Sequence, residues 1–335
     1  MIGENIKRFR LLKGISLRSF GQQVGMSQTA IMKYEQNILT PDGEKLIKFA
    51  NVLGCSVLDL LKDNSDRKVI NLNFRKRESL SKKKVELLTE IINGKINNYL
   101  DVLGLNNISK TKLKKYKVSS LEDASLAAYK FRSDNEINEI LPLVNLCNVI
   151  ENLGISIIIL DNKDEEFKGF DGLSQIVDGF PFICIASNIN YYRQRFTLAH
   201  ELGHLILNID KSLDEEKICN EFASSLLLPK KAMELEFGKN RVNINRREYE
   251  IVREEYRVSI KAIIYSLEKN GIISSNYAKL SYMNFNKNLL KNEEIMALEY
   301  NETPRKYEQL ATRLFNQGII TVSRFNEISV DFYKE

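Results

Sequence analysis

Apolar residues recur at helical spacing through the first sixty residues. Ile6, Phe9 and Leu12 share one face of a predicted first helix. Ser16 and Ser27 are suited to cap two further helices, because their hydroxyls can accept a hydrogen bond from the first helical turn. The same spacing predicts four more short helices, over residues 17–24, 28–36, 40–53 and 57–61.

The second and third of these helices are joined by a tight turn at Gly25, where glycine permits a positive φ. Such a pair is typical of a helix-turn-helix, whose second helix lies in the major groove of DNA. Ala30, Ile31 and Tyr34 face the core in this interpretation. The candidate DNA-binding residues are the polar positions of the outward face, namely Ser27, Gln28, Thr29, Lys33 and Gln36. The alternative is a helical domain kept for dimerisation without DNA contact.

A long amphipathic helix is predicted over residues 82–103. It follows from the helical spacing of Val85, Leu88, Ile92, Ile96, Tyr99 and Leu103. The surrounding segment, 67–117, is strongly basic, with 14 Lys and Arg against 4 Asp and Glu, whereas residues 118–335 have 26 against 33. A basic stripe suits a polyanion such as DNA, and a structural strut with solvated lysines is the alternative.

The rest of the chain mixes helical and strand patterns. Helices are predicted over 120–133 and 137–152, and short strands over 155–160, 173–177 and 182–186. A further helix over 193–208 follows, which makes an α+β domain the expected class. Residues 249–256 and 259–270 form a second helix-turn-helix-like pair, expected to pack beside the core rather than to read DNA.

Both histidines of the chain lie on the predicted helix 193–208. His200 and His204 are four residues apart, so they project from one helix face and can share a tetrahedral zinc ion. Glu201 follows the first histidine and can act as general base towards a water that the metal acidifies. This H-E-x-x-H arrangement is a signature of metal-dependent hydrolysis, and a purely structural histidine pair is the alternative.

The third protein ligand cannot be histidine, because the chain has only two. A carboxylate is expected, or less readily a thiolate. The nearby candidates are Asp210, Asp214, Glu215, Glu216, Cys219 and Glu221. On the predicted helix 214–228, Glu216 shares a face with Asn220 and with the small Ala223, which leaves room for a metal. This pattern favours Glu216 and leaves Glu215 open.

Composition indicates the class of protein and its expected location. Hydrophobic residues make up 43% of the 335 residues and charged residues 28%, as in globular proteins. The four cysteines are scattered without a C-x-x-C pair, which indicates reduced thiols. Neither a membrane-spanning stretch nor a signal peptide is visible, so a cytoplasmic location without membrane contact is expected.

Two resemblances extend this picture. The patterns R-x-L-K-G-I-S, G-Q-Q-V-G-M-S and I-M-K-Y-E within residues 3–62 resemble the Cro/repressor-type helix-turn-helix (XRE) family. R-Q-R-F-T-L-A-H-E-L-G-H and E-K-I-C-N-E-F-A-S-S-L-L-L-P resemble the core motifs of the ImmA/IrrE family of zinc metallopeptidases. The second resemblance implies Zn²⁺ ligands at His200, His204 and Glu216, with Glu201 as the catalytic residue.

We therefore expect a multidomain protein. Its parts are an all-α helix-turn-helix head (1–66), a basic helical connector (67–117), an α+β zincin-like metallopeptidase domain (118–275) and a helical C-terminal region (276–335). The resemblance implies a peptidase that cleaves a helix-turn-helix repressor, with operator DNA as a second partner and a homodimer suggested by the repressor-type head. The alternatives are a regulator whose zincin domain is a sensor or interaction module, or an antitoxin-like autorepressor.

Overall fold

The computed structural model describes residues 2–61, 81–160, 169–187, 191–287, 302–330 and 332. The chain divides into two compact units, Met1–Asp101 and Val102–Glu335. Residues 67–80 of the predicted basic connector lie outside the described residues. The expected four-part division stays a prediction.

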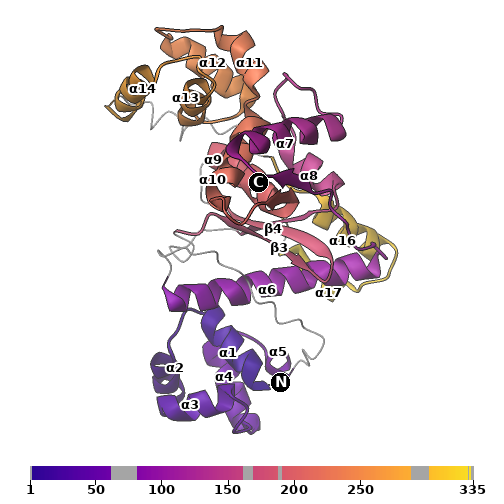
Figure 1. Cartoon of the computed structure of the whole chain (residues 1–335). Helices are drawn as coiled ribbons and strands as arrows, with labels where there is room; N and C mark the ends of the chain where they lie inside the picture. The colour runs from indigo at the N-terminus through magenta and orange to yellow at the C-terminus, as the bar shows by residue number, and fades with distance from the viewer. Residues whose placement is uncertain are drawn as a thin grey trace. The chain divides into compact units, whose positions relative to one another are not determined.

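The head is all-helical, as predicted (Figure 1). Its helices are α1 (Ile2–Leu12), α2 (Leu17–Val24), α3 (Gln28–Glu35), α4 (Gly43–Leu53) and α5 (Val57–Leu61). Ser16 and Ser27 cap α2 and α3 through their side chains, and Gly25 adopts φ 71° between them. The helix expected from Thr40 begins at Gly43 because Asp42 caps it, accepting from Lys45 N.

The five helices enclose one core. Phe20 and Phe49 pack ring against ring with centroids 5.3 Å apart. A buried Arg10–Glu35 pair joins α1 to the end of α3, with Nη2 donating to Oε2 at 2.9 Å. Gly21 of α2 lies so close to the turn that an added Cβ would be 2.6 Å from Met26 O. The turn between α2 and α3 can therefore pack this closely against α2 only because residue 21 has no side chain.

The predicted long helix is confirmed as α6, Lys82–Leu105. Its apolar stripe is buried, with Leu88, Ile92, Ile96 and Tyr99 at most 2% exposed. The boundary between the two compact units falls within this helix, after Asp101.

The second unit is a mixed α/β arrangement followed by helices (Figure 1). Its strands are β1 (Tyr116–Val118), β2 (Ser156–Leu160), β3 (Gly172–Val177), β4 (Phe180–Ala186) and β5 (Leu207–Ile209). Its first helices are α7 (Leu121–Asp134), α8 (Leu146–Asn152), α9 (Tyr191–Ile206) and α10 (Glu215–Leu227). The later helices are α11 (Lys230–Phe237), α12 (Arg246–Tyr256), α13 (Ile260–Lys269), α14 (Ser275–Lys287), α16 (Lys306–Asn316) and α17 (Val322–Ser329).

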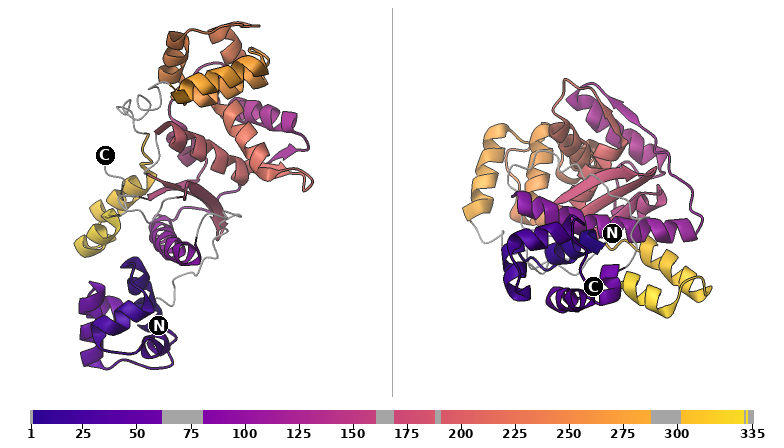
Figure 2. Two further views of the ribbon diagram at one scale, coloured as in Figure 1. Left: turned by 90° about the vertical axis from the view of Figure 1, so that its left-hand side faces the viewer. Right: turned by 90° about the horizontal axis from the view of Figure 1, so that it is seen from below.

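A three-stranded sheet of order β2–β4–β3 supports this unit. β2 is parallel and β3 antiparallel to β4, and β1 and β5 form a separate parallel pair. α9 packs on β3 and β4, α10 packs on α9, and α7 packs on α10. The orange helices α11–α14 lie beyond α10, on its side away from the sheet, where α13 contacts α10 and α11 (Figures 1 and 2). The α+β expectation is thus confirmed.

The helix predicted over 137–152 is wrong in its first half, since α8 begins at Leu146. Arg132 is 1% exposed, and its guanidinium donates hydrogen bonds to the carbonyl oxygens of Asn138 and Leu141. Asn138 Oδ1 in turn accepts from Ile140 N and Leu141 N, which forms a side-chain turn. These backbone groups are already bonded in a non-helical way, so the helix begins only beyond Pro142.

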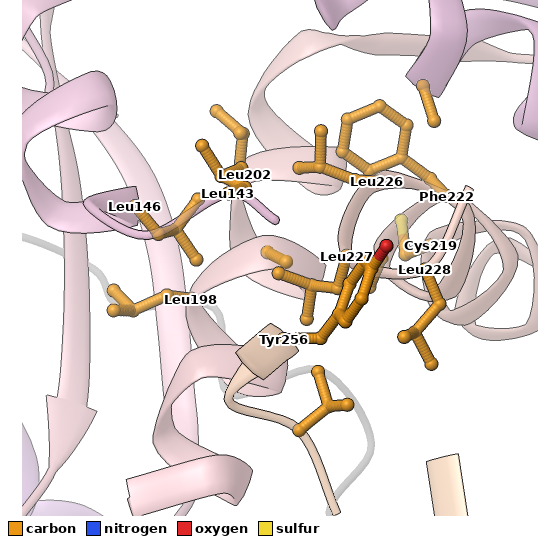
Figure 3. Packing of buried hydrophobic residues seen from close by; sticks show 14 of the residues in the cluster. Leu143, Leu146, Leu198, Leu202, Cys219, Phe222, Leu226, Leu227, Leu228 and Tyr256 are labelled. Atoms are coloured by element: carbon orange, nitrogen blue, oxygen red, sulfur yellow. The ribbon is translucent and has the colours of Figure 1, made fainter. Parts of the chain in front are cut away.

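The core of the unit lies between α9, α10 and the segments that cover them. Leu198 and Leu202 of α9 belong to the same buried cluster as Phe222 and Leu226 of α10, and each is at most 2% exposed (Figure 3). The packing of α10 on α9 is part of this cluster. Among the described residues, no helix is long and apolar enough to cross a membrane.

Candidate metal centre

The two histidines project from one face of α9, as their spacing predicts. His200 Nε2 and His204 Nε2 lie 3.1 Å apart. Glu216, in the first turn of α10, faces both: Oε2 is 3.2 Å from His200 Nε2 and Oε1 is 3.5 Å from His204 Nε2. Its contacts with His200, and then with His204, hold the pKa of Glu216 well below its usual range.

This donor set fits a zinc ion. Ligand atoms about 2.0–2.1 Å from zinc at tetrahedral corners lie roughly 3.3–3.4 Å from one another. The separations of 3.1 Å between the two Nε2 atoms and of 3.2 Å between His200 Nε2 and Glu216 Oε2 are close to that value, and with one ligand atom from each residue all three lie within 4.8 Å of one another. The Glu216 side chain is 59% exposed, against 11% for His200 and 3% for His204, so the cluster is open to solvent on the carboxylate side.

The other candidate ligands are engaged elsewhere. Asp210 accepts from Ser212, and Asp214 caps α10. Glu215 Oε1 lies 2.9 Å from His204 Nδ1, which is the nitrogen away from Glu216. Cys219 is fully buried and lies 3.3 Å from the same Nδ1. Glu221 pairs with Lys269. The structure therefore places Glu216, and not Glu215, against both Nε2 atoms.

Glu201 is held by a residue that sequence reasoning missed. Glu201 is 3% exposed, and Ser174 Oγ of β3 donates to its Oε2 at 2.8 Å. The sequence contains no local signal for this contact, because the two residues are 27 positions apart. The motif F-D-G-L-S places Ser174 on a strand, but only the packing of that strand on α9 brings it to Glu201.

Two glycines allow α9 to sit between β3 and α10. A Cβ on Gly172 would lie 2.7 Å from Thr197 Cγ2. Gly172 and Ser174, two apart on the strand, thus meet Thr197 and Glu201, four apart on the helix. On the other side, a Cβ on Gly203 would lie 3.3 Å from Phe222 and 3.4 Å from Cys219 Sγ.

Tyr191 and Arg195, in the first half of α9, point into the protein interior. Arg195 is 1% exposed, and its guanidinium contacts the carbonyls of Leu143 and Val144 and the carboxylate of Glu302. Tyr191 is 4% exposed, and its hydroxyl lies 3.5 Å from Glu302 Oε1. Burial lowers the pKa of Arg195 to about 10. Both side chains therefore join the C-terminal segment to α9.

The predicted DNA-reading residues all lie on the exposed face of α3 or at its cap. This set comprises Ser27, Gln28, Thr29, Lys33 and Gln36. Ser27 Oγ accepts from Ala30 N at 3.1 Å, so this hydroxyl is engaged in the cap. Ile31 and Tyr34 are buried on the opposite face, and Ala30 is half-buried.

The second pair, α12–α13, repeats the turn of the first. A left-handed Arg257 (φ 54°) precedes Ser259, whose φ and ψ of −70° and 150° match those of Ser27, −71° and 151°. The exposure of the second helix differs between the two pairs, however. Ile260 and Ile264 of α13 are buried at 3% and 1%. At these two positions α13 therefore packs against protein, as expected.

Comparisons with known proteins also distinguish a helix-turn-helix region from a peptidase-family region. Residues 150–268 match the model of the IrrE N-terminal-like domain (Peptidase_M78), and residues 6–60 match a helix-turn-helix model. Over 76 residues, 23% of the chain, there is 32% identity to the uncharacterized HTH-type transcriptional regulator YqaE of Bacillus subtilis (strain 168). That match spans about two thirds (66%) of YqaE.

Two solved structures show limited likeness. One is a Mycobacterium tuberculosis transcriptional regulator, with 15% identity and a TM-score of 0.31 over 51% of each chain. The other is Bacillus thuringiensis PlcR in complex with the peptide PapR7 and DNA, with 11% identity and a TM-score of 0.18 over 98% of this chain and 92% of that one.

Proposed function

Because the chain joins a helix-turn-helix domain of transcription regulators to a peptidase-family domain of the IrrE N-terminal-like type, we propose that it is a DNA-binding, zinc-dependent endopeptidase. Its substrate in this proposal is a transcriptional repressor, itself a helix-turn-helix protein, whose cleavage releases transcription. The observation that carries the proposal is the convergence of His200, His204 and Glu216, whose ligand atoms lie within 4.8 Å of one another.

His200, His204 and Glu216 would hold the metal. A bound zinc ion supplies Lewis acidity, which makes water more acidic and a peptide carbonyl more electrophilic. Glu201 takes the proton of the attacking water and then delivers it to the leaving amine. Ser174 fixes Oε2 of that carboxylate, so Glu201 keeps one orientation through both proton transfers.

The head supports the choice of substrate. Gln28, Thr29 and Lys33 lie exposed on α3 as readout of a major groove requires. Binding to an operator raises the local concentration of the peptidase around any protein bound to the same DNA. A repressor at that operator is therefore the protein that this chain meets most often. The proposed setting of these steps is the cytoplasm.

The test is co-expression of the full chain with candidate helix-turn-helix repressors from the same genome, followed by mass spectrometry of fragments. We expect zinc-loaded wild type to cleave the repressor at a defined bond, and the Glu201→Gln variant to leave it intact while binding zinc. Equal repressor survival with both proteins contradicts the peptidase proposal. If His204→Ala then changes regulation without any cleavage, the domain acts as a sensor instead.

A further inference from the structure

The side of each imidazole that faces away from Glu216 is also occupied. His200 Nδ1 lies 2.9 Å from Asn220 Oδ1, and His204 Nδ1 lies 2.9 Å from Glu215 Oε1. Glu215, Glu216 and Asn220 all belong to α10. One helix thus provides a carboxylate to both Nε2 atoms and an oxygen to each Nδ1 atom.

We propose that Glu215 and Asn220 are positioning residues that set the tautomer and the ring orientation of the two histidines. The inference rests on the metal site of the proposed function. A carboxylate and an amide oxygen accept hydrogen bonds, so each Nδ1 carries the proton and donates it. The lone pair of each imidazole is then on Nε2, the atom that faces Glu216 and the metal position.

The packing of the two helices sets the spacing between these groups. Gly203 lets α10 approach α9 within van der Waals contact, because a Cβ there would already touch Phe222 and Cys219. Asp214 caps α10 by accepting from Lys217 N at 3.3 Å, which fixes the first turn of the helix. The helix positions of Glu215 and Asn220 relative to the imidazoles are therefore set by the packing of α10 on α9.

The two positioning residues are chemically unequal. Glu215 brings a negative charge to His204, whereas Asn220 brings only a dipole to His200. A charged acceptor forms the stronger hydrogen bond and makes the imidazole a stronger donor to a cation. His204 is also the more buried ring, 3% exposed against 11% for His200. Loss of Glu215 should therefore weaken zinc binding more than loss of Asn220.

The experiment measures the zinc dissociation constant of the full-length protein by competition with a chromophoric chelator, which requires no substrate. We expect Glu215→Ala to raise this constant by about 10- to 100-fold and Asn220→Ala by a smaller factor. Glu215→Gln and Asn220→Asp keep an oxygen acceptor, so both should bind zinc more tightly than the matching alanine variants. The matched control is Asp214→Asn, which removes a neighbouring charge but keeps a capping side chain and should bind zinc as wild type does.

Two further measurements separate positioning from folding. Thermal unfolding of the metal-free variants should match that of the metal-free wild type, and the visible absorption of cobalt-loaded Glu215→Ala should differ from that of cobalt-loaded wild type. Wild-type zinc affinity in both alanine variants overturns the inference. Zinc binding by wild type without repressor cleavage contradicts only the peptidase proposal, whereas wild type that binds no zinc overturns both.

Discussion

Ser174 shows at the residue scale how a group outside the motif can serve its chemistry. It donates to Glu201 Oε2 at 2.8 Å, and Glu201 is only 3% exposed. We expect Ser174→Ala to lower kcat for repressor cleavage about tenfold, with unchanged KM and zinc affinity, since one hydrogen bond to a charged acceptor is lost. Ser174→Thr keeps the hydroxyl and should retain more of the rate.

A double-mutant comparison distinguishes this role from general damage to β3. In the Glu201→Gln background the carboxylate is already gone, so Ser174→Ala should have no further effect on the residual rate. An independent further loss there, or a normal kcat in Ser174→Ala alone, would contradict the positioning role. Single-turnover cleavage with excess protein measures both cases.

At the scale of elements, a buried polar cluster joins α13 to the metal-bearing layer. Glu221 of α10 is 1% exposed and accepts from Ser225 Oγ at 3.0 Å, from Ser125 of α7 and from Lys269 of α13. The Lys269 side chain is 23% exposed. A single carboxylate thus holds three helices together.

Removing the ammonium group should be costly. Lys269→Met leaves the buried Glu221 charge without its counter-ion, and we expect the free energy of unfolding to fall by about 3 kcal/mol. Adding Glu221→Gln should restore most of that loss, because the remaining buried group is then neutral. Urea unfolding followed by circular dichroism gives both values, and equal stability of the two variants would contradict the argument.

The elements that could be predicted are those with a local pattern. The helix at Lys82–Leu105 and the strands β2, β3 and β4 follow from apolar periodicity in their own sequences. β1 and β5 were not predicted, because each has three residues and is stabilised only by the other, with Tyr116 opposite Leu207. The first half of the predicted helix 137–152 is wrong for a similar reason, because the Arg132 guanidinium of α7 binds carbonyl groups in that segment.

The residues of the candidate site also divide into those that a local pattern predicts and those that only the packing shows. His200, Glu201 and His204 could be chosen from their spacing, and helical geometry narrowed the third ligand to Glu215 or Glu216. Only the packing of α10 on α9 shows that these neighbours face opposite nitrogens of His204. The contact of Ser174 with Glu201 depends on the register of β3 against α9, which no pattern in either segment encodes.

At the scale of the whole molecule, the C-terminal segment completes the fold of the second unit. Glu302 is 6% exposed at its side chain, pairs with Arg195 of α9, and accepts from Leu146 N at 3.0 Å at the start of α8. In turn, Glu151 at the end of α8 accepts hydrogen bonds from Arg305 N and Lys306 N at the start of α16. Segments more than 150 residues apart thus cap each other's helices.

We expect Glu302→Ala to lower the free energy of unfolding of this unit by about 3–5 kcal/mol, because it leaves the buried Arg195 guanidinium without its carboxylate. Differential scanning calorimetry should show a lower melting temperature. As a control, Glu308→Ala removes an exposed acid from the first turn of α16 and should change stability by less than about 0.5 kcal/mol. Equal melting temperatures for Glu302→Ala and wild type would mean that the pair adds nothing to the fold.

The division into two units predicts that DNA binding and cleavage can be lost separately. The residues proposed to read DNA lie in the first unit, on α3, whereas the three ligands and Glu201 lie in the second. Lys33→Ala should weaken operator binding in a mobility-shift assay, through loss of a phosphate or guanine contact. Glu201→Gln should bind the operator as wild type does.

Cleavage assays with and without operator DNA then show what the head contributes. With free repressor and no DNA, Lys33→Ala should cleave at the wild-type rate, because its metal ligands and Glu201 are unchanged. With repressor bound to operator DNA, wild type should cleave faster than Lys33→Ala, because only wild type is held on the same DNA at a high effective concentration. If Lys33→Ala also cleaves free repressor slowly, the head takes part in recognising the substrate protein itself, and the separation of the two tasks is wrong.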